Sequence, residues 1–171
     1  HRFALRRALV VAPKKVAEAT WSNETAKWDH LSDLRVSVVL GSAARREAAL
    51  AAEADVYVIN RDNVAWLVDY YSDPHHKDRT WPFDCVVLDE SSSFKNHQAL
   101  RFKKLKVMRP RIRRMIELTG TPTPHGLTDL WSQIYLLDGG MRLGRTVSVY
   151  RDMFFLPDKR NGATVWSYKP R

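Results

Sequence analysis

Cysteine, glycine and long apolar runs are all scarce in this chain of 171 residues. The one cysteine, Cys85, has no partner for an intrachain disulfide, so nothing in the sequence points to an oxidising compartment. No apolar run approaches the roughly 20 residues that a membrane-spanning helix needs, and the first residues do not resemble a signal peptide. We therefore expect a cytoplasmic protein with no membrane partner.

The overall composition is that of a folded domain with an excess of positive charge. Hydrophobic residues make up 44% and charged residues 27%, which excludes disordered, collagen-like and low-complexity chains. The formal net charge of +9 favours polyanionic partners, but it does not by itself identify a nucleic-acid enzyme. The six histidines lack the spacing of metal ligands, so we expect no zinc site.

Five short apolar runs alternate with segments of helical spacing, at residues 8–12, 36–40, 56–60, 83–88 and 115–118. Continuous β-branched runs of this length are typical of strands buried on both faces of a parallel sheet. The sequence therefore predicts a three-layer α/β domain with right-handed crossovers. Residues 141–171 lack such a pattern, and we expect them to be irregular. Four tryptophans are predicted to pack in the interior and two to lie exposed in loops: Trp21, Trp28, Trp66 and Trp131, against Trp81 and Trp166.

Two carboxylates follow the fourth apolar run, at Asp89 and Glu90. Ligands of parallel sheets bind outside the carboxyl ends of the strands, and an acidic pair there is the arrangement of a Walker B element. In that arrangement the first carboxylate holds nucleotide-bound Mg²⁺ through water, and the second orients or deprotonates the attacking water. The alternative is a solvated acidic pair at the end of a strand.

Two hydroxyls flank a glycine after the fifth apolar run, in the string Leu118-Thr119-Gly120-Thr121-Pro122. We expect this strand to lie beside the one that ends at Asp89, so the hydroxyls would be within reach of the acidic pair. They could then pass the state of a nucleotide to a neighbouring surface. Threonine and glycine are also ordinary turn residues, so a structural turn is the alternative.

Taken in order, these strings resemble the first motor domain of superfamily-two helicase-like ATPases, the DEAD/DEAH-box type, and most of all the Swi/Snf-related branch and its phage and prophage members. The resemblance covers roughly residues 8–155, and it is carried by residues 9–13 with Trp21 and Trp28, 55–60, 89–96, 118–122 and 129–144 with Tyr150 and Arg151. It implies a RecA-like, P-loop NTPase fold, with ATP and Mg²⁺ as cofactors and duplex DNA as partner. It also implies the cytoplasm of a bacterium or of a phage-infected host cell.

The sequence departs from the family pattern at three places. Ser91 and Ser92 follow the carboxylates where the superfamily usually has alanine and then histidine or aspartate, and His125 stands where the relatives usually have asparagine. The 7 glycines form no Gly-x-x-x-x-Gly-Lys-Ser/Thr loop, which would bind the β- and γ-phosphates and which in the family precedes Leu9.

The missing loop leads us to expect an incomplete motor domain. We predict a partial RecA-like ATP-binding domain at residues 1–140, truncated at its N-terminus, and an extension at residues 141–171 toward a missing second RecA-like domain. Such a chain would be inactive in isolation. The resemblance also implies that DNA lies across the strand-end loops, which favours Lys14, Arg61, Lys95 and Asn96 as DNA-facing residues. The eight basic residues between Arg101 and Arg114 are interpreted as a solvated face, with phosphate contact as the alternative.

Three functions compete at this point. The leading hypothesis is a fragment of an ATP-dependent DNA helicase or translocase, in which Asp89 and Glu90 are catalytic and Thr119, Gly120 and Thr121 couple ATP to DNA. The second is a non-catalytic nucleic-acid-binding domain on a RecA-like scaffold. A nuclease that uses the two carboxylates is the third, and it is disfavoured because no further acidic and lysine residues occur at matching strand ends.

Overall fold

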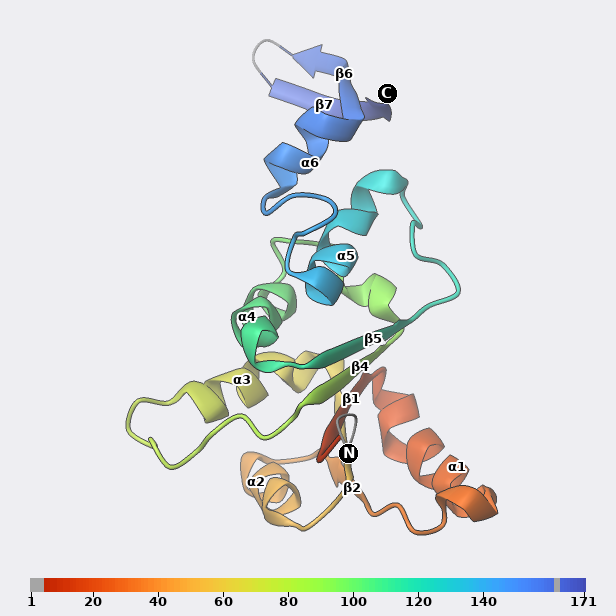
Figure 1. Cartoon of the computed structure of the whole chain (residues 1–171), viewed down its shortest axis with the longest axis vertical. Coiled ribbons are helices and arrows are strands. Elements are labelled where there is room, and N and C mark those ends of the chain that lie inside the picture. The colour runs from red at the N-terminus through yellow and green to blue at the C-terminus, as the bar shows by residue number, and fades with distance from the viewer. Residues whose placement is uncertain (1–4, 162–163) are drawn as a thin grey trace.

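A five-stranded parallel sheet forms the centre of the molecule, in a computed structural model that describes residues 5–161 and 164–171 (Figure 1). The strand order is β2-β3-β1-β4-β5, and every neighbouring pair is parallel. The strands are β1 (Ala8–Ala12), β2 (Val36–Val39), β3 (Val56–Asn60), β4 (Cys85–Asp89) and β5 (Arg114–Leu118). All five predicted strands are present, and the predicted parallel α/β fold is confirmed.

Helices connect the strands and lie on both faces of the sheet (Figure 1). They are a π-helical segment η1 (Val16–Thr20) that continues into α1 (Trp21–Lys27), then α2 (Ala43–Ala51), α3 (Val64–Ser72), α4 (Leu100–Met108), α5 (Leu130–Asp138) and α6 (Val147–Phe154). Short 3₁₀ turns are η2 (Asp29–Leu31), η3 (Arg61–Asn63), η4 (Ser91–Phe94), η5 (Arg109–Arg111) and η6 (Leu127–Asp129). None of the helices in the described ranges combines the length and the apolar character of a membrane-spanning segment.

The two faces of the sheet bury different residues of the same strand. Leu9 and Val11 of β1 belong to the large core that α2, α3, α4 and α5 complete, whereas Val10 and Ala12 pack with Ala17 of η1 on the opposite face. This alternation follows from the period of two in a strand, and it explains why the apolar runs are continuous. The face that carries η1 is less well covered by helices at the edge strand β5, where Ile116 is 38% exposed.

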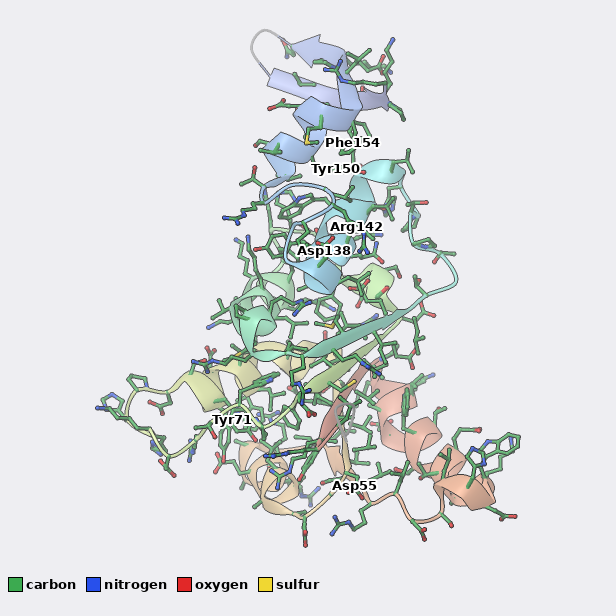
Figure 2. The ribbon with its side chains drawn as sticks, viewed as in Figure 1. Asp55, Tyr71, Asp138, Arg142, Tyr150 and Phe154 are labelled. Atoms are coloured by element: carbon green, nitrogen blue, oxygen red, sulfur yellow. The ribbon has the colours of Figure 1, made fainter. Side chains whose placement is uncertain are left out.

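The prediction that residues 141–171 are irregular is wrong. They form α6 and an antiparallel hairpin of β6 (Phe155–Asn161) and β7 (Thr164–Pro170). The Thr146 side chain caps α6 by accepting a hydrogen bond from the Val149 amide, and Tyr150 and Phe155 are buried in the large core. Figure 2 shows Tyr150 where α6 meets the start of α5, and its hydroxyl donates to the Leu127 carbonyl of η6 at 2.8 Å. The division of the chain at residue 140 stays a prediction.

Two of the tryptophan predictions are wrong. Trp28 is 48% exposed, because it follows the last residue of α1; its indole donates to Glu24 of that helix and lies near the His30 ring, at 6.1 Å between centroids. Trp81 was expected to be exposed, but it is half-buried against Phe83 and donates to the carbonyl of that residue at 2.8 Å. The side chain of Trp166 lies outside the described residues. The predicted interior packing is confirmed for the remaining three, which are Trp21, Trp66 and Trp131.

Candidate nucleotide and nucleic-acid site

The acidic pair lies at the carboxyl end of β4, where the predicted Walker B element would be. Asp89 is the last residue of the strand and its Oδ2 accepts a hydrogen bond from the indole Nε1 of Trp21 at 3.4 Å. Because Asp89 alternates with Leu88 of the large core, its carboxylate points toward the face that carries η1 and α1. Trp21 therefore connects the first crossover helix to this carboxylate.

Glu90 has a left-handed backbone conformation, with φ 57° and ψ 58°. Within the described residues it is the one non-glycine residue with positive φ. Such a conformation costs about 1–2 kcal/mol for a residue with a Cβ, and strained residues of this kind cluster at functional sites. Glu90 is exposed at the point where β4 ends, and it lines a surface cavity there.

A cavity of about 360 Å³ beside Glu90 brings three of the predicted DNA-facing residues together. Arg61, Lys95 and Asn96 line it; Arg61 directly follows β3, and Lys95 and Asn96 follow the η4 turn after β4. Arg101 of α4 is a fourth lining residue, which the sequence reasoning assigned to a solvated basic face. Three cationic side chains and one carboxylate, that of Glu90, line the cavity, and this excess of positive charge favours an anionic ligand such as a phosphate.

Lys14 lies in a different hollow from the other predicted DNA-facing residues. This hollow, also of about 360 Å³, is lined by Lys14, Gly41 and Asn60 among others, and by Arg46, which the sequence reasoning missed. Lys14 forms an exposed ion pair with Glu18 at 3.8 Å, one turn along the helix. Since β1 and β3 are neighbours, both hollows open at the same carboxyl edge of the sheet.

The basic run between Arg101 and Arg114 is only partly the solvated face that was predicted. Lys103 and Arg111 are exposed as expected. Arg109, in contrast, donates to the carbonyls of Ile112 and Leu137 and joins η5 to the end of α5. These residues differ because α4 turns one side toward α3 and α5, a packing that charge counting does not detect.

The Thr119–Thr121 turn follows β5, which lies beside β4 as predicted, with Leu118 opposite Asp89. The Thr119 Oγ1 accepts a hydrogen bond from the Thr121 amide at 3.2 Å, so this hydroxyl shapes the turn itself. Among the described residues, neither threonine hydroxyl is hydrogen-bonded to Asp89 or Glu90. Their role in coupling stays a prediction.

A buried polar network joins the segment after β4 to this turn, and sequence reasoning missed it. Ser91 and Gln133 are 0% and 3% exposed, and the Ser91 Oγ lies 3.0 Å from the Gln133 Oε1. The Gln133 Nε2 donates to the carbonyls of Pro122 at 2.7 Å and Asp129 at 3.1 Å. One signal was available in the sequence: a glutamine stands among the mostly apolar residues 130–137, which form α5.

Glu117 of β5 lies beside this network. Burial raises the pKa of Glu117 to about 8, and the nearby Ser91 hydroxyl opposes that shift only in part. Its Oε1 is buried and has no hydrogen-bond partner among the described residues. Glu117 therefore carries a proton at neutral pH, because burial disfavours the charged form of a carboxyl.

The residues present fit a magnesium ion that arrives with a nucleotide. The described residues contain no group of three or more His, Cys, Asp or Glu side chains that could hold a metal ion. Mg²⁺ in phosphate-transfer sites needs only one or two carboxylates, because waters and phosphate oxygens supply the remaining ligands. Asp89 provides one such carboxylate, and its hydrogen bond with Trp21 occupies only Oδ2.

Comparison with known families decides which group of proteins has this arrangement. A family model described as the SNF2-related domain matches residues 4–158. The chain belongs to the SNF2-related family. The resemblance to the Swi/Snf-related branch is thereby confirmed.

Relatives of this SNF2-related chain come from a phage and from eukaryotes. It is 40% identical over 153 residues to a putative protein p41 of Acyrthosiphon pisum secondary endosymbiont phage 1. This match covers 86% of this chain and 32% of that protein. It is 30% identical over 129 residues to the helicase swr1 of Aspergillus fumigatus, and this match covers 75% of this chain and 7% of the helicase. It is also 30% identical over 131 residues to the protein CHROMATIN REMODELING 19 of Arabidopsis thaliana, with 72% and 17% covered. The chain thus spans about a third or less of these relatives.

A solved structure supports the same SNF2-related fold. The SWI2/SNF2 ATPase core of Sulfolobus solfataricus, solved in complex with double-stranded DNA, matches with a TM-score of 0.65 and 26% sequence identity. The match covers 88% of this chain and 28% of that core. The predicted RecA-like architecture is confirmed by this likeness.

Proposed function

We propose that this SNF2-related chain is part of an ATP-driven motor that moves on duplex DNA. The observation that carries the proposal is the position of Asp89 and Glu90 at the end of β4, next to a cavity lined by Arg61, Lys95 and Asn96. An acidic pair beside a cationic cavity suits a protein that handles ATP and nucleic-acid phosphates at one edge of its sheet.

The two carboxylates have different roles in this proposal. Asp89, oriented by the Trp21 indole, holds the water shell of the nucleotide's metal ion. When bound, Mg²⁺ neutralises charge on the phosphates. Glu90 accepts the proton of the attacking water, and its strained backbone fixes where that carboxylate stands.

The DNA interface of this proposal is the cationic edge of the sheet. Arg61 and Lys95 contact backbone phosphates, with Asn96 as a neutral hydrogen-bonding neighbour, and Lys14 extends the interface toward β1. Phosphate contacts of this kind are independent of base sequence and weaken with salt. Thr119, Gly120 and Thr121 link the nucleotide side to this surface.

The motor needs more than this chain, in our proposal. A phosphate-binding loop and a second RecA-like domain that supplies arginine to the nucleotide would complete the ATP site, so the chain alone is inactive. The proposed setting is the cytoplasm of a bacterium or a phage-infected cell. The competing function is a nucleic-acid-binding domain without catalysis, which the cationic cavity alone would also support.

Glu90→Gln in the longer protein that carries this chain separates the two functions. The amide keeps the size of the side chain and removes its basicity, so nucleotide binding should persist while ATP turnover falls at least about a hundredfold. Glu47→Gln, at an exposed site on α2, is the matched control and should retain turnover. Wild-type turnover in the Glu90 variant would refute the catalytic assignment, and absence of any turnover in the wild type would favour the binding domain.

A further inference from the structure

We propose that Gln133 is the positioning residue that holds the Thr119–Pro122 turn against the end of β4. This inference deepens the proposed function, because it names the physical connection between the acidic pair and the turn. Gln133 belongs to neither segment: it lies in α5, 42 residues beyond Ser91 and 11 residues beyond Pro122 in the chain. It touches neither carboxylate and acts only through its contacts with the two segments.

The hydrogen bonds fix the orientation of the Gln133 amide. Its Nε2 lies against two carbonyl oxygens, of Pro122 and Asp129, so this atom must be the donor. The Oε1 therefore faces Ser91, and the Ser91 hydroxyl must donate to it. Both N–H groups and the oxygen of the buried amide thus have hydrogen-bond partners. These three bonds fix the position of the two segments relative to each other.

The neighbouring residue of α5 reinforces the same connection. The Ser132 hydroxyl donates to the Lys95 carbonyl at 2.8 Å, at the end of η4, and Ser132 is 1% exposed. One turn of α5 thus holds the segment after the acidic pair through Ser132 and Ser91, and the Thr119–Pro122 turn through Gln133. Both serines and Gln133 point into the interface between α5 and the sheet edge.

The donors of the network follow one another in a single direction. The Ser91 hydroxyl donates to the Gln133 oxygen, and the Gln133 amide donates to the carbonyls of Pro122 and Asp129. A buried network whose donors are all satisfied is rigid, so displacement at one end is felt at the other.

Hydrogen exchange on the 171-residue chain tests the positioning role directly. Gln133→Met keeps the length of the side chain and removes its three hydrogen bonds. Amides at residues 119–126 and 91–95 should then exchange faster by about tenfold or more, while those of β1 and β3 keep their protection. Gln98→Met, at an exposed site before α4, is the matched control and should change neither segment.

Two results would overturn the positioning role. Unchanged exchange at residues 119–126 would show that the turn is held by other contacts. Equal acceleration in β1, β3 and the turn would show that Gln133 serves general stability alone. If Gln133→Met does not fold, Ser91→Ala replaces it, because this variant removes only the hydroxyl that joins residues 91–95 to Gln133; exchange at 91–95 should still accelerate, and unchanged exchange there would overturn the role.

A second measurement tests the consequence for coupling in the longer protein. Gln133→Met should leave basal ATP turnover within about twofold of wild type and lower its stimulation by DNA about tenfold or more. Wild-type stimulation in that variant would overturn the coupling part of the inference. If the wild type itself does not hydrolyse ATP, the proposed function fails, and the exchange experiment still decides whether Gln133 positions the turn.

Discussion

Glu117→Gln should stabilise the protein by an amount that grows with pH. The ordinary pKa of a glutamate is 4.5, and burial raises that of Glu117 to about 8. Between these values the folded protein keeps a proton that the unfolded chain has released. The free energy of unfolding of the wild type therefore falls as pH rises, because the folded state then binds more protons than the unfolded state.

The magnitude follows from the size of the shift. One proton of difference changes the free energy of unfolding by about 1.4 kcal/mol per pH unit, so the contribution of Glu117 falls by about 3 kcal/mol between pH 5 and pH 7. The stabilising contribution of Glu117 is fully present below pH 4.5, and it is lost as pH rises to the pKa near 8 that Glu117 has in the folded protein. Glutamine has the size and shape of the protonated carboxyl, but it does not titrate.

Urea unfolding at pH 5, 6, 7 and 8 measures this effect. The stability difference between variant and wild type should increase with pH up to about 8 and then level off. Glu47→Gln on the surface of α2 reports the effect of removing one exposed carboxylate. A Glu117→Gln difference that is independent of pH would refute the assignment of a buried, protonated Glu117.

Three further predictions concern the proposed function. The 171-residue chain alone should not turn over ATP above a buffer blank, with or without DNA, and measurable steady-state turnover would contradict this. The same chain should bind two unrelated duplexes with similar, salt-sensitive affinity in fluorescence anisotropy. Replacing Arg61 and Lys95 by alanine should reduce the slope of log affinity against log salt concentration by roughly 0.9 for each phosphate that is no longer neutralised, whereas Lys77→Ala should leave this slope unchanged. In the longer protein, a Thr119→Ala, Thr121→Ala double variant should keep nucleotide affinity within about thirtyfold, since two such hydroxyls contribute about 1 kcal/mol each, and should lose DNA stimulation. Normal DNA-stimulated turnover and translocation would leave the turn a purely structural element.

The strands could be predicted from sequence because their burial on both faces leaves continuous apolar runs. The ranges predicted for β1 and β3 are those of the structure, and β4 is shifted by two residues at its start. Residues 141–171 could not be predicted in the same way. Their helix is short, and the burial of Tyr150 and Phe155 depends on α5 and the large core, which are distant in sequence.

Part of the candidate site could be predicted, and part of it depends on tertiary contacts. The family motifs located Asp89 and Glu90, and the resemblance favoured Arg61, Lys95 and Asn96, which line one cavity, but not Arg101, which lines it too. The Ser91–Gln133 bond joins residues 42 positions apart, and no local pattern announces such a pairing. Glu117 stood in an apolar strand as an unexplained charge, and only its burial shows that it is neutral there.

The left-handed backbone of Glu90 places stability and catalysis in opposition at one position. Glycine would relieve the strain of that conformation, so a library of position 90 variants selected for resistance to heat would be enriched in glycine. A library selected for ATP turnover would, under the proposed function, retain glutamate. The backbone conformation that holds the Glu90 carboxylate in place thus makes Glu90→Gly attractive to stability-guided engineering of the domain. Under the proposed function, such engineering should avoid this substitution.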